Sequence, residues 1–382
     1  MLGKLQVILN SSFFILNSSF SILHSSFTMS LHPIFDPNAA AVEGSGVFGL
    51  PFTRDDSRFI LVPVPYEATT SYRGGTSLGP EAIRQASYQV DLFDLGTGRP
   101  YEAGIFMLED PDLIGEYNQA AKPIAQQVIH EGTDLDKATL AECLAQVNDY
   151  SAKVNEWVYQ ITRDILDEGR IAGIVGGDHS VPFGAIQAYA ERFPGLGILH
   201  IDAHADLRDS YEGFTWSHAS IMHNVVTRLS GVSRLVQVGI RDFCEAELDL
   251  IQRSNGRIVT HFDEQLAARK FEGASWKSLI EKIIEPLPAQ VYLSFDIDGL
   301  DPALCPHTGT PVPGGLSFQE AVALIAALAR SGRKIVGFDL NEVAPGPEGD
   351  EWDANVGARL LYKMIGYCQL SQTAVKSAPS KP

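Results

Sequence analysis

Three runs of apolar residues each end in a cluster of histidine and aspartate, and this pairing constrains the chain more than any other feature. The runs and clusters are Ile171–Val175 before Gly176-Gly177-Asp178-His179-Ser180, Gly197–Ile201 before Asp202-Ala203-His204-Ala205-Asp206, and Val291–Phe295 before Asp296-Ile297-Asp298. Such continuous apolar runs are typical of strands with helices on both faces of the sheet. Because ligands bind at the carboxyl ends of parallel strands, we expect the three clusters to share one crevice.

The alternation of strands and helices along the chain predicts an α/β fold built from parallel βαβ units. Further strands are predicted at Phe59–Val64, Leu235–Val238, Ile258–Thr260 and Ile335–Phe338. Helices are predicted near residues 148–168, 182–193, 218–230, 276–285, 317–330 and 353–368. The glycine-rich stretch Tyr72–Arg84 is predicted to be a loop that leads into a helix, with Pro80 in its first turn.

Five segments are expected along the chain. Residues 8–27 repeat Ile-Leu-Asn/His-Ser-Ser-Phe with a period of seven, which fits neither a membrane span nor a signal peptide. Residues 1–28 are therefore predicted to be non-native sequence before a start at Met29, with a leader peptide as the alternative. An irregular arm is expected at 29–57, the catalytic domain at 58–370 with an insertion or lid at 98–147, and a disordered tail at 371–382.

The composition limits the partners of the protein. The 382 residues carry a net charge of −18, which repels phosphate backbones and argues against nucleic acid as a partner. This charge favours a small cationic substrate, or it serves only solubility. The four cysteines have no C-x-x-C spacing, which predicts a reducing, cytoplasmic location. No apolar run is long enough to span a membrane.

The residue types in the three clusters predict a metal site. Residues two apart in an extended chain point to the same side, so Asp202, His204 and Asp206 can face one point, as can Asp296 and Asp298. With His179 they make four carboxylates and two imidazoles, which suit Mn²⁺, with Ni²⁺, Co²⁺ or Fe²⁺ as alternatives. Six ligands suit two ions, with two carboxylates shared between them. Each cluster alone is compatible with a turn or a helix cap, but their combination favours metal.

At these positions the sequence resembles the ureohydrolase family, which includes arginase, agmatinase, formimidoylglutamase and guanidine hydrolase. The resemblance covers about residues 57–370. Besides the clusters, it rests on Ser294–Pro302, Gly309–Leu316 and Asn341–Pro345, and on the segment with Gly74, Gly75, Gly79, Pro80 and Arg84. It implies a three-layer α/β/α fold with a mainly parallel central sheet, and a homotrimer or homohexamer.

The resemblance also implies a role for each site residue. His179 and Asp206 bind one metal, His204 and Asp298 bind the other, and Asp202 and Asp296 bridge the pair. A hydroxide between the ions is the implied nucleophile, which Asp206 also orients. Glu342 is expected to hold the guanidinium group, and His218, with a near-neutral pKa, to shuttle protons. The alternatives are a loop salt bridge for Glu342 and a buried structural role for His218.

The loop between Asp206 and His218 bears on the substrate. It lacks the Asn and Ser pattern of arginases, and Ala219-Ser220 after His218 differs from the usual agmatinase pair. Phe214 and Trp216 are expected either to narrow the pocket around guanidine itself or simply to pack, and Thr215 to contact an N–H group. The preferred prediction is a guanidine hydrolase with Mn²⁺ or Ni²⁺, and agmatinase is the alternative. A catalytically silent binding subunit is the alternative from another class, but it is expected to have lost a ligand, and none is missing.

Overall fold

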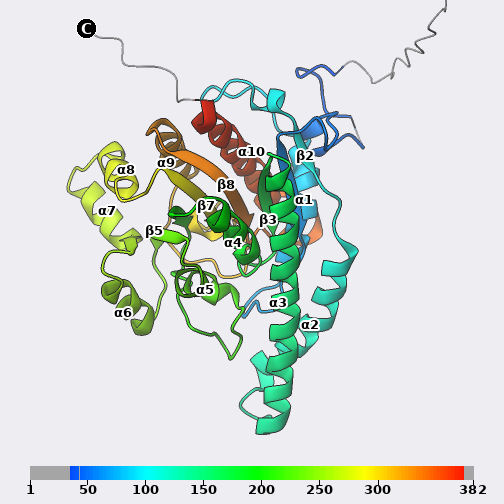
Figure 1. The fold of residues 1–382 in the computed structure, drawn as a ribbon, viewed down its shortest axis with the longest axis vertical. Coiled ribbons are helices and arrows are strands. Elements are labelled where there is room, and N and C mark those ends of the chain that lie inside the picture. Colours follow the sequence, from blue (N-terminus) through cyan, green and yellow to red (C-terminus); the bar gives the residue numbers. More distant parts are fainter. Residues whose placement is uncertain (1–34, 43, 374–382) are drawn as a thin grey trace, which may run out of the picture. The chain divides into compact units, whose positions relative to one another are not determined.

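The structure is a computed structural model that describes residues 35–42 and 44–373. Residues 1–28, predicted to be non-native, lie outside the described residues. The arm predicted before residue 58 is irregular where it is described, with one short 3-10 turn at Val47–Gly49. From residue 59 on, strands and helices largely alternate along the chain (Figure 1).

Eight parallel strands form the central sheet, in the order β2-β1-β3-β8-β7-β4-β5-β6. Their bounds are β1 Phe59–Val64, β2 Ile105–Met107, β3 Ile171–Gly176, β4 Leu196–Ile201, β5 Val232–Ile240, β6 Ile258–Phe262, β7 Gln290–Asp296 and β8 Lys334–Asn341. All six residues of β1, β3 and β4 are buried, as expected for strands covered on both faces. The predicted parallel α/β sheet is thereby confirmed.

Helices cover both faces of the sheet and complete the predicted three-layer α/β/α arrangement (Figure 1). In one layer, α3 packs against α2 and α4, and α4 contacts α5. In the other, α10 packs against α1 and α9, and α9 contacts α8. The bounds are α1 Gly79–Ser87, α2 Asp112–Glu131, α3 Lys137–Asp167, α4 Phe183–Arg192, α5 Ile221–Arg228, α6 Glu245–Arg253, α7 Asp263–Phe271, α8 Trp276–Ile284, α9 Phe318–Arg330 and α10 Trp352–Thr373.

Two segments differ from the sequence-based expectation. The region 98–147, predicted to be an insertion or lid, supplies edge strand β2 and helix α2 to the fold. It also supplies the start of α3, where the Asp136 side chain accepts bonds from two backbone N–H groups and caps the helix. At the other end, α10 continues to Thr373, three residues into the tail predicted from 371. The buried Ser371 accepts a bond from Ile335 N, which ties this last turn to β8, so that part of the tail prediction was wrong.

The strand order explains why distant clusters meet. Strands β3, β8, β7 and β4 are consecutive neighbours in the middle of the sheet. Since all four run in the same direction, the residues that follow them converge at one edge. Within the described part of the chain, no helix is both long and apolar enough to cross a membrane.

Candidate metal centre

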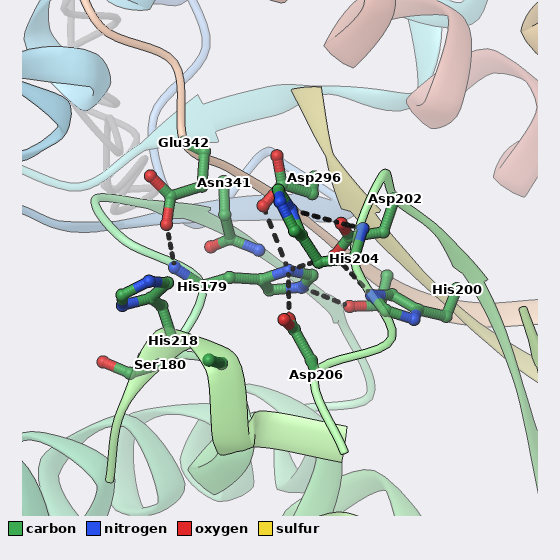
Figure 2. Close-up of polar contacts among 12 residues, drawn as sticks. His179, Ser180, His200, Asp202, His204, Asp206, His218, Asp296, Asn341 and Glu342 are labelled. Carbon is green, nitrogen blue, oxygen red and sulfur yellow. Dashed lines mark hydrogen bonds and ion pairs between the residues drawn. The ribbon is translucent and has the colours of Figure 1, made fainter. Parts of the chain in front are cut away.

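His179 lies at the centre of the first group of predicted ligands (Figure 2). Its Nδ1 is 3.2 Å from Asp202 Oδ2, 3.3 Å from Asp296 Oδ2 and 3.5 Å from Asp206 Oδ2. His179 follows β3, Asp296 ends β7, and the two other aspartates follow β4. Three carboxylates from two further strands thus converge on one imidazole nitrogen.

The second group surrounds His204, whose side chain is one quarter exposed. Its Nδ1 lies 3.1 Å from Asp298 Oδ2 and 3.6 Å from Asp202 Oδ1. Asp202 therefore faces both groups, with one carboxylate oxygen toward each histidine. All six predicted ligands belong to one cluster. Within it, Asp202, His204 and Asp298 form one set with metal-binding spacing, and His179, Asp202 and Asp206 fall in another.

The electrostatics of the cluster fit a cation. Burial raises the pKa values of Asp206 and Asp296 well above the usual range of an aspartate. The charges of neighbouring carboxylates raise both values further. Burial acts in the same direction on Asp202, but His200, His179 and His204 together hold its pKa well below the usual value. Burying several ionised carboxylates together costs free energy unless a positive charge lies among them. With its two imidazoles, the donor set suits divalent metal ions.

His218 and Glu342, to which the sequence analysis gave roles in catalysis and substrate binding, lie beside the cluster (Figure 2). Glu342 is buried, and its Oε1 accepts a bond of 2.8 Å from His179 N. His218 lies on the cavity wall, with Tyr211 edge-on to its ring at 6.1 Å. Burial and the nearby His204 lower the pKa of His218 to about 4, whereas a near-neutral pKa was expected.

Two residues of the site hold an unusual backbone conformation. Asp206 and Glu342 have φ values of 54° and 63°, in the left-handed region that residues other than glycine seldom adopt. Such conformations cost free energy and occur mainly where the surrounding structure enforces them, often at functional sites. For Glu342, the bonds from its N–H to Gly177 O and from His179 N to its carboxylate fix this turn.

A cavity of about 240 Å³ borders the cluster of candidate metal ligands. His204, Asp206 and His218 form part of its wall, and its other lining residues include Ser71, Tyr72, Arg208, Tyr211, Asp242, Glu247, Thr310, Pro311 and Val312. Glu247 already accepts bonds from Leu207 N and Cys244 N. The exposed Asp242 carboxylate has no partner among the described residues.

The residues predicted to narrow the pocket do not line this cavity. Phe214 is buried in a small apolar cluster that includes Ala125 of α2 and Val147 of α3. The Trp216 ring packs edge-on against Phe183 at 5.0 Å, and the Arg228 guanidinium lies over it at 4.8 Å. Thr215 is held through its backbone, which donates to Asn148 and accepts from Asn224. A role of these three residues in substrate binding stays a prediction.

The structure also brings in four polar residues to which the sequence analysis gave no role in the site. His200 Nε2 lies 2.8 Å from Asp202 Oδ2, and Ser294 Oγ lies 2.9 Å from His179 Nε2. Behind them, Asp339 Oδ1 accepts from Ser294 and from Asn341 Nδ2. All four are buried side chains within otherwise apolar strands. Their presence in apolar strands could have indicated that they support the site, because a buried polar group needs a hydrogen-bond partner.

Comparisons with known proteins agree with this geometry. The sequence pattern of the arginase family matches residues 57–366. The chain is 31% identical to an N(1)-aminopropylagmatine ureohydrolase of Synechocystis over 83% of its length and 91% of that protein. It is 29% identical to the agmatinase of Bacillus subtilis, over 81% and 92% of the two chains.

A solved structure extends the comparison to the fold. The proclavaminate amidino hydrolase of Streptomyces clavuligerus superimposes with a TM-score of 0.65 at 22% identity, over 87% of this chain and 99% of that one. This likeness shows that the two chains share a fold. Since the arginase-family pattern matches residues 57–366 and the Synechocystis relative is 31% identical over 83% of the chain, the chain belongs to the arginase family.

Proposed function

We propose that the protein is a metal-dependent ureohydrolase that acts on a linear guanidino compound with a second cationic group, of the agmatine class. The carrying observation is the cavity of about 240 Å³, whose wall includes His204, His218 and the unpaired carboxylate of Asp242, the register neighbour of His204. A cavity of this size has room beyond a guanidinium group, and an exposed carboxylate in its wall suits an ammonium group on the same ligand. Both relatives described above are named for agmatine or an agmatine derivative as substrate.

The six ligands would hold two divalent ions, with Asp202 shared between the two histidine groups. Such ions supply a Lewis acid and a water activated near neutral pH. We propose Mn²⁺ or Ni²⁺, since both accept mixed carboxylate and imidazole ligands. We also propose that the protein forms a homotrimer or a homohexamer. We propose a cytoplasmic location because all four cysteines are free, as is usual in a reducing compartment.

The chain's own residues account for binding and proton transfer. Glu342 carries a buried carboxylate beside His179, and burial with the charges of Asp296 and Asp178 raises its pKa well above the usual value. A guanidinium cation would offset this repulsion and form a charge-assisted contact with the carboxylate. His218 is neutral at pH 7, because its pKa is lowered to about 4, and a neutral imidazole can accept a proton and pass it to a leaving amine.

Guanidine alone is the rival substrate, and one experiment separates the two. Enzyme loaded with Mn²⁺ or with Ni²⁺ is given agmatine, N(1)-aminopropylagmatine, guanidine and arginine, and urea is measured. We expect kcat/KM to be higher for an agmatine-class substrate than for guanidine. A higher value for guanidine would overturn the proposal, and no urea from any substrate would favour a silent binding subunit.

Asp242→Asn sharpens this comparison, because it removes only the charge of one carboxylate that lines the cavity. We expect KM for agmatine to rise on the order of 5-fold, as for loss of an exposed ion pair of ~1 kcal/mol. The values for guanidine should not change. Asp249→Asn in α6 is the matched control, since Asp249 is paired with Arg253 on the outer surface. An equal effect of Asp242→Asn on both substrates would show that Asp242 does not recognise the second cationic group of agmatine.

A further inference from the structure

A row of polar side chains crosses the sheet beneath the cluster of candidate metal ligands. Asp339, Ser294, His200, Gln237 and Thr260 come from β8, β7, β4, β5 and β6, and each is the direct register partner of the next. The first four are fully buried. Register partners lie side by side on the same face of a sheet, so the row is continuous. Two of its members contact metal ligands: Ser294 touches His179, and His200 touches Asp202.

Gln237 fixes the hydrogen-bonding roles along this row. Its Nε2 lies 2.7 Å from Ala205 O and 3.0 Å from His200 Nδ1, and its Oε1 accepts from Thr260 Oγ1 at 2.9 Å. A backbone carbonyl can only accept, so the side of the amide that faces Ala205 must be the NH₂ group. The second hydrogen of that group then points to His200 Nδ1, which must carry a lone pair.

It follows that the proton of neutral His200 sits on Nε2, which is 2.8 Å from Asp202 Oδ2 and donates to it. The other oxygen of the same carboxylate, Oδ1, accepts from His204 N at 2.6 Å. With His179 Nδ1 unprotonated, as a metal ligand must be, each oxygen of Asp202 is held by one donor and keeps one lone pair free. These oxygens face different histidines, His179 and His204, as a bridging carboxylate requires.

We propose that His200 is a positioning residue, locked as the Nε2–H tautomer by Gln237, which orients Asp202 between the two metal positions. Although His200 lies close enough to His179, Asp202 and Asp206 to complete a ligand set, both of its nitrogens are committed, so it does not bind metal. Partners that orient a ligand from behind commonly account for 10- to 100-fold in metal affinity. The proposal rests on the metal centre of the proposed function.

Two His200 variants separate hydrogen-bond donation from packing. In His200→Gln, the side-chain amide can still donate to Asp202 Oδ2, whereas His200→Leu fills the space without a donor. Mn²⁺ affinity is measured by competition with a chelator, and the number of bound ions by metal analysis. We expect a 10- to 100-fold loss for the Leu variant and recovery of most of it in the Gln variant. His261→Gln, on the edge strand β6, is the matched control and should bind as the wild type does.

Two outcomes would overturn the proposal: wild-type affinity in the Leu variant, or equal losses in both variants, which would indicate packing alone. The tautomer is tested on the wild-type protein by ¹⁵N-histidine NMR, with the His200 signal identified from its absence in the Gln variant. An Nε2–H signal is expected, and an Nδ1–H signal would contradict the assignment. If the wild type bound no Mn²⁺ or Ni²⁺, the proposed function would fail, but the NMR result would still decide the tautomer.

Discussion

Ser294 Oγ lies 2.9 Å from His179 Nε2 and donates its hydrogen to Asp339 Oδ1, also at 2.9 Å. Because the hydroxyl hydrogen is given to the carboxylate, the hydroxyl oxygen is left to accept from His179 Nε2–H. When His179 is neutral, as a metal ligand must be, its lone pair then sits on Nδ1, the nitrogen that faces Asp202, Asp206 and Asp296. Ser294 and Asp339 thus turn the correct side of the imidazole toward the metal position.

Removing this hydroxyl should weaken metal binding. For Ser294→Ala we expect a 10- to 100-fold loss of Mn²⁺ affinity, because the His179 ring loses the acceptor that fixes its tautomer and orientation. Chelator competition measures the loss. Ser331→Ala is the control, since the Ser331 hydroxyl donates to Leu328 O after α9, away from the site. Unchanged affinity in Ser294→Ala would show that the ring is held by its carboxylate neighbours alone.

His218 should affect turnover and not metal content. Its ring lies on the cavity wall and makes no contact with the six ligands among the bonds of the described residues. We expect His218→Asn to lower kcat by about 10²- to 10⁴-fold, the usual contribution of a residue that transfers a proton. KM and the number of bound ions should stay close to the wild-type values.

A histidine on the neighbouring helix provides the control for that prediction. His223 in α5 approaches Asp209 and lies outside the cavity lining, so His223→Asn should keep wild-type kcat. Steady-state kinetics and metal analysis are run on both variants. Loss of bound metal in His218→Asn would instead assign His218 a structural role in the cluster.

Trp216 should contribute to stability and not to substrate choice. Its ring packs between Phe183 and Arg228, outside the cavity lining. We expect Trp216→Ala to lower the free energy of unfolding by about 3 kcal/mol, through loss of a packed aromatic ring, and to leave the ratio of kcat/KM for agmatine and guanidine unchanged. Chemical denaturation and the substrate panel measure the two effects.

Trp352→Ala serves as a comparison for Trp216→Ala, because Trp352 is 46% exposed at the start of α10. It should destabilise the protein less than Trp216→Ala does. A shift of preference toward agmatine in folded Trp216→Ala would restore the sequence-based idea that this ring narrows the pocket.

The sequence was informative about the fold where its pattern was long and apolar. Fully buried strands such as β1 and β3 are recognisable because helices cover both faces of the sheet. Strand β2 has only three residues at the edge of the sheet, too few to show a period. Helix α2 contains Pro123, and the first part of α3 is largely polar, so neither shows a clear helical pattern in residues 98–147.

The grouping of the six candidate ligands could be predicted, because their residue types and spacing placed them directly after strands of a parallel sheet. Their supporting residues could not, since the contact of His200 with Gln237 depends on β4 and β5 being neighbours. The left-handed backbone of Asp206 and Glu342 left no sequence signal either, because glycine or asparagine is the usual mark of that conformation. The placement of Phe214 and Trp216 was likewise set by packing against distant helices.

His261 should make the stability of the protein depend on pH. Burial, with the positive charge of Arg269, lowers the pKa of His261 to about 4 in the folded chain, and its Nε2 has no partner. In the unfolded chain its pKa is about 6.5. Between these values the unfolded state binds more protons, so stability falls as pH falls, while above about 6.5 His261 contributes no pH dependence. At pH 5.0 the loss is about 2 kcal/mol.

We therefore expect His261→Gln to reduce the difference in unfolding free energy between pH 7.5 and pH 5.0 by about 2 kcal/mol, because glutamine does not titrate. Urea denaturation at the two pH values measures this difference. His130→Gln, at an exposed position near the end of α2, is the matched control and should leave the difference unchanged. His261→Gln could instead keep the full wild-type difference in unfolding free energy between the two pH values. The imidazole would then be protonated in the folded protein at pH 5.0, and burial beside Arg269 would not control its pKa.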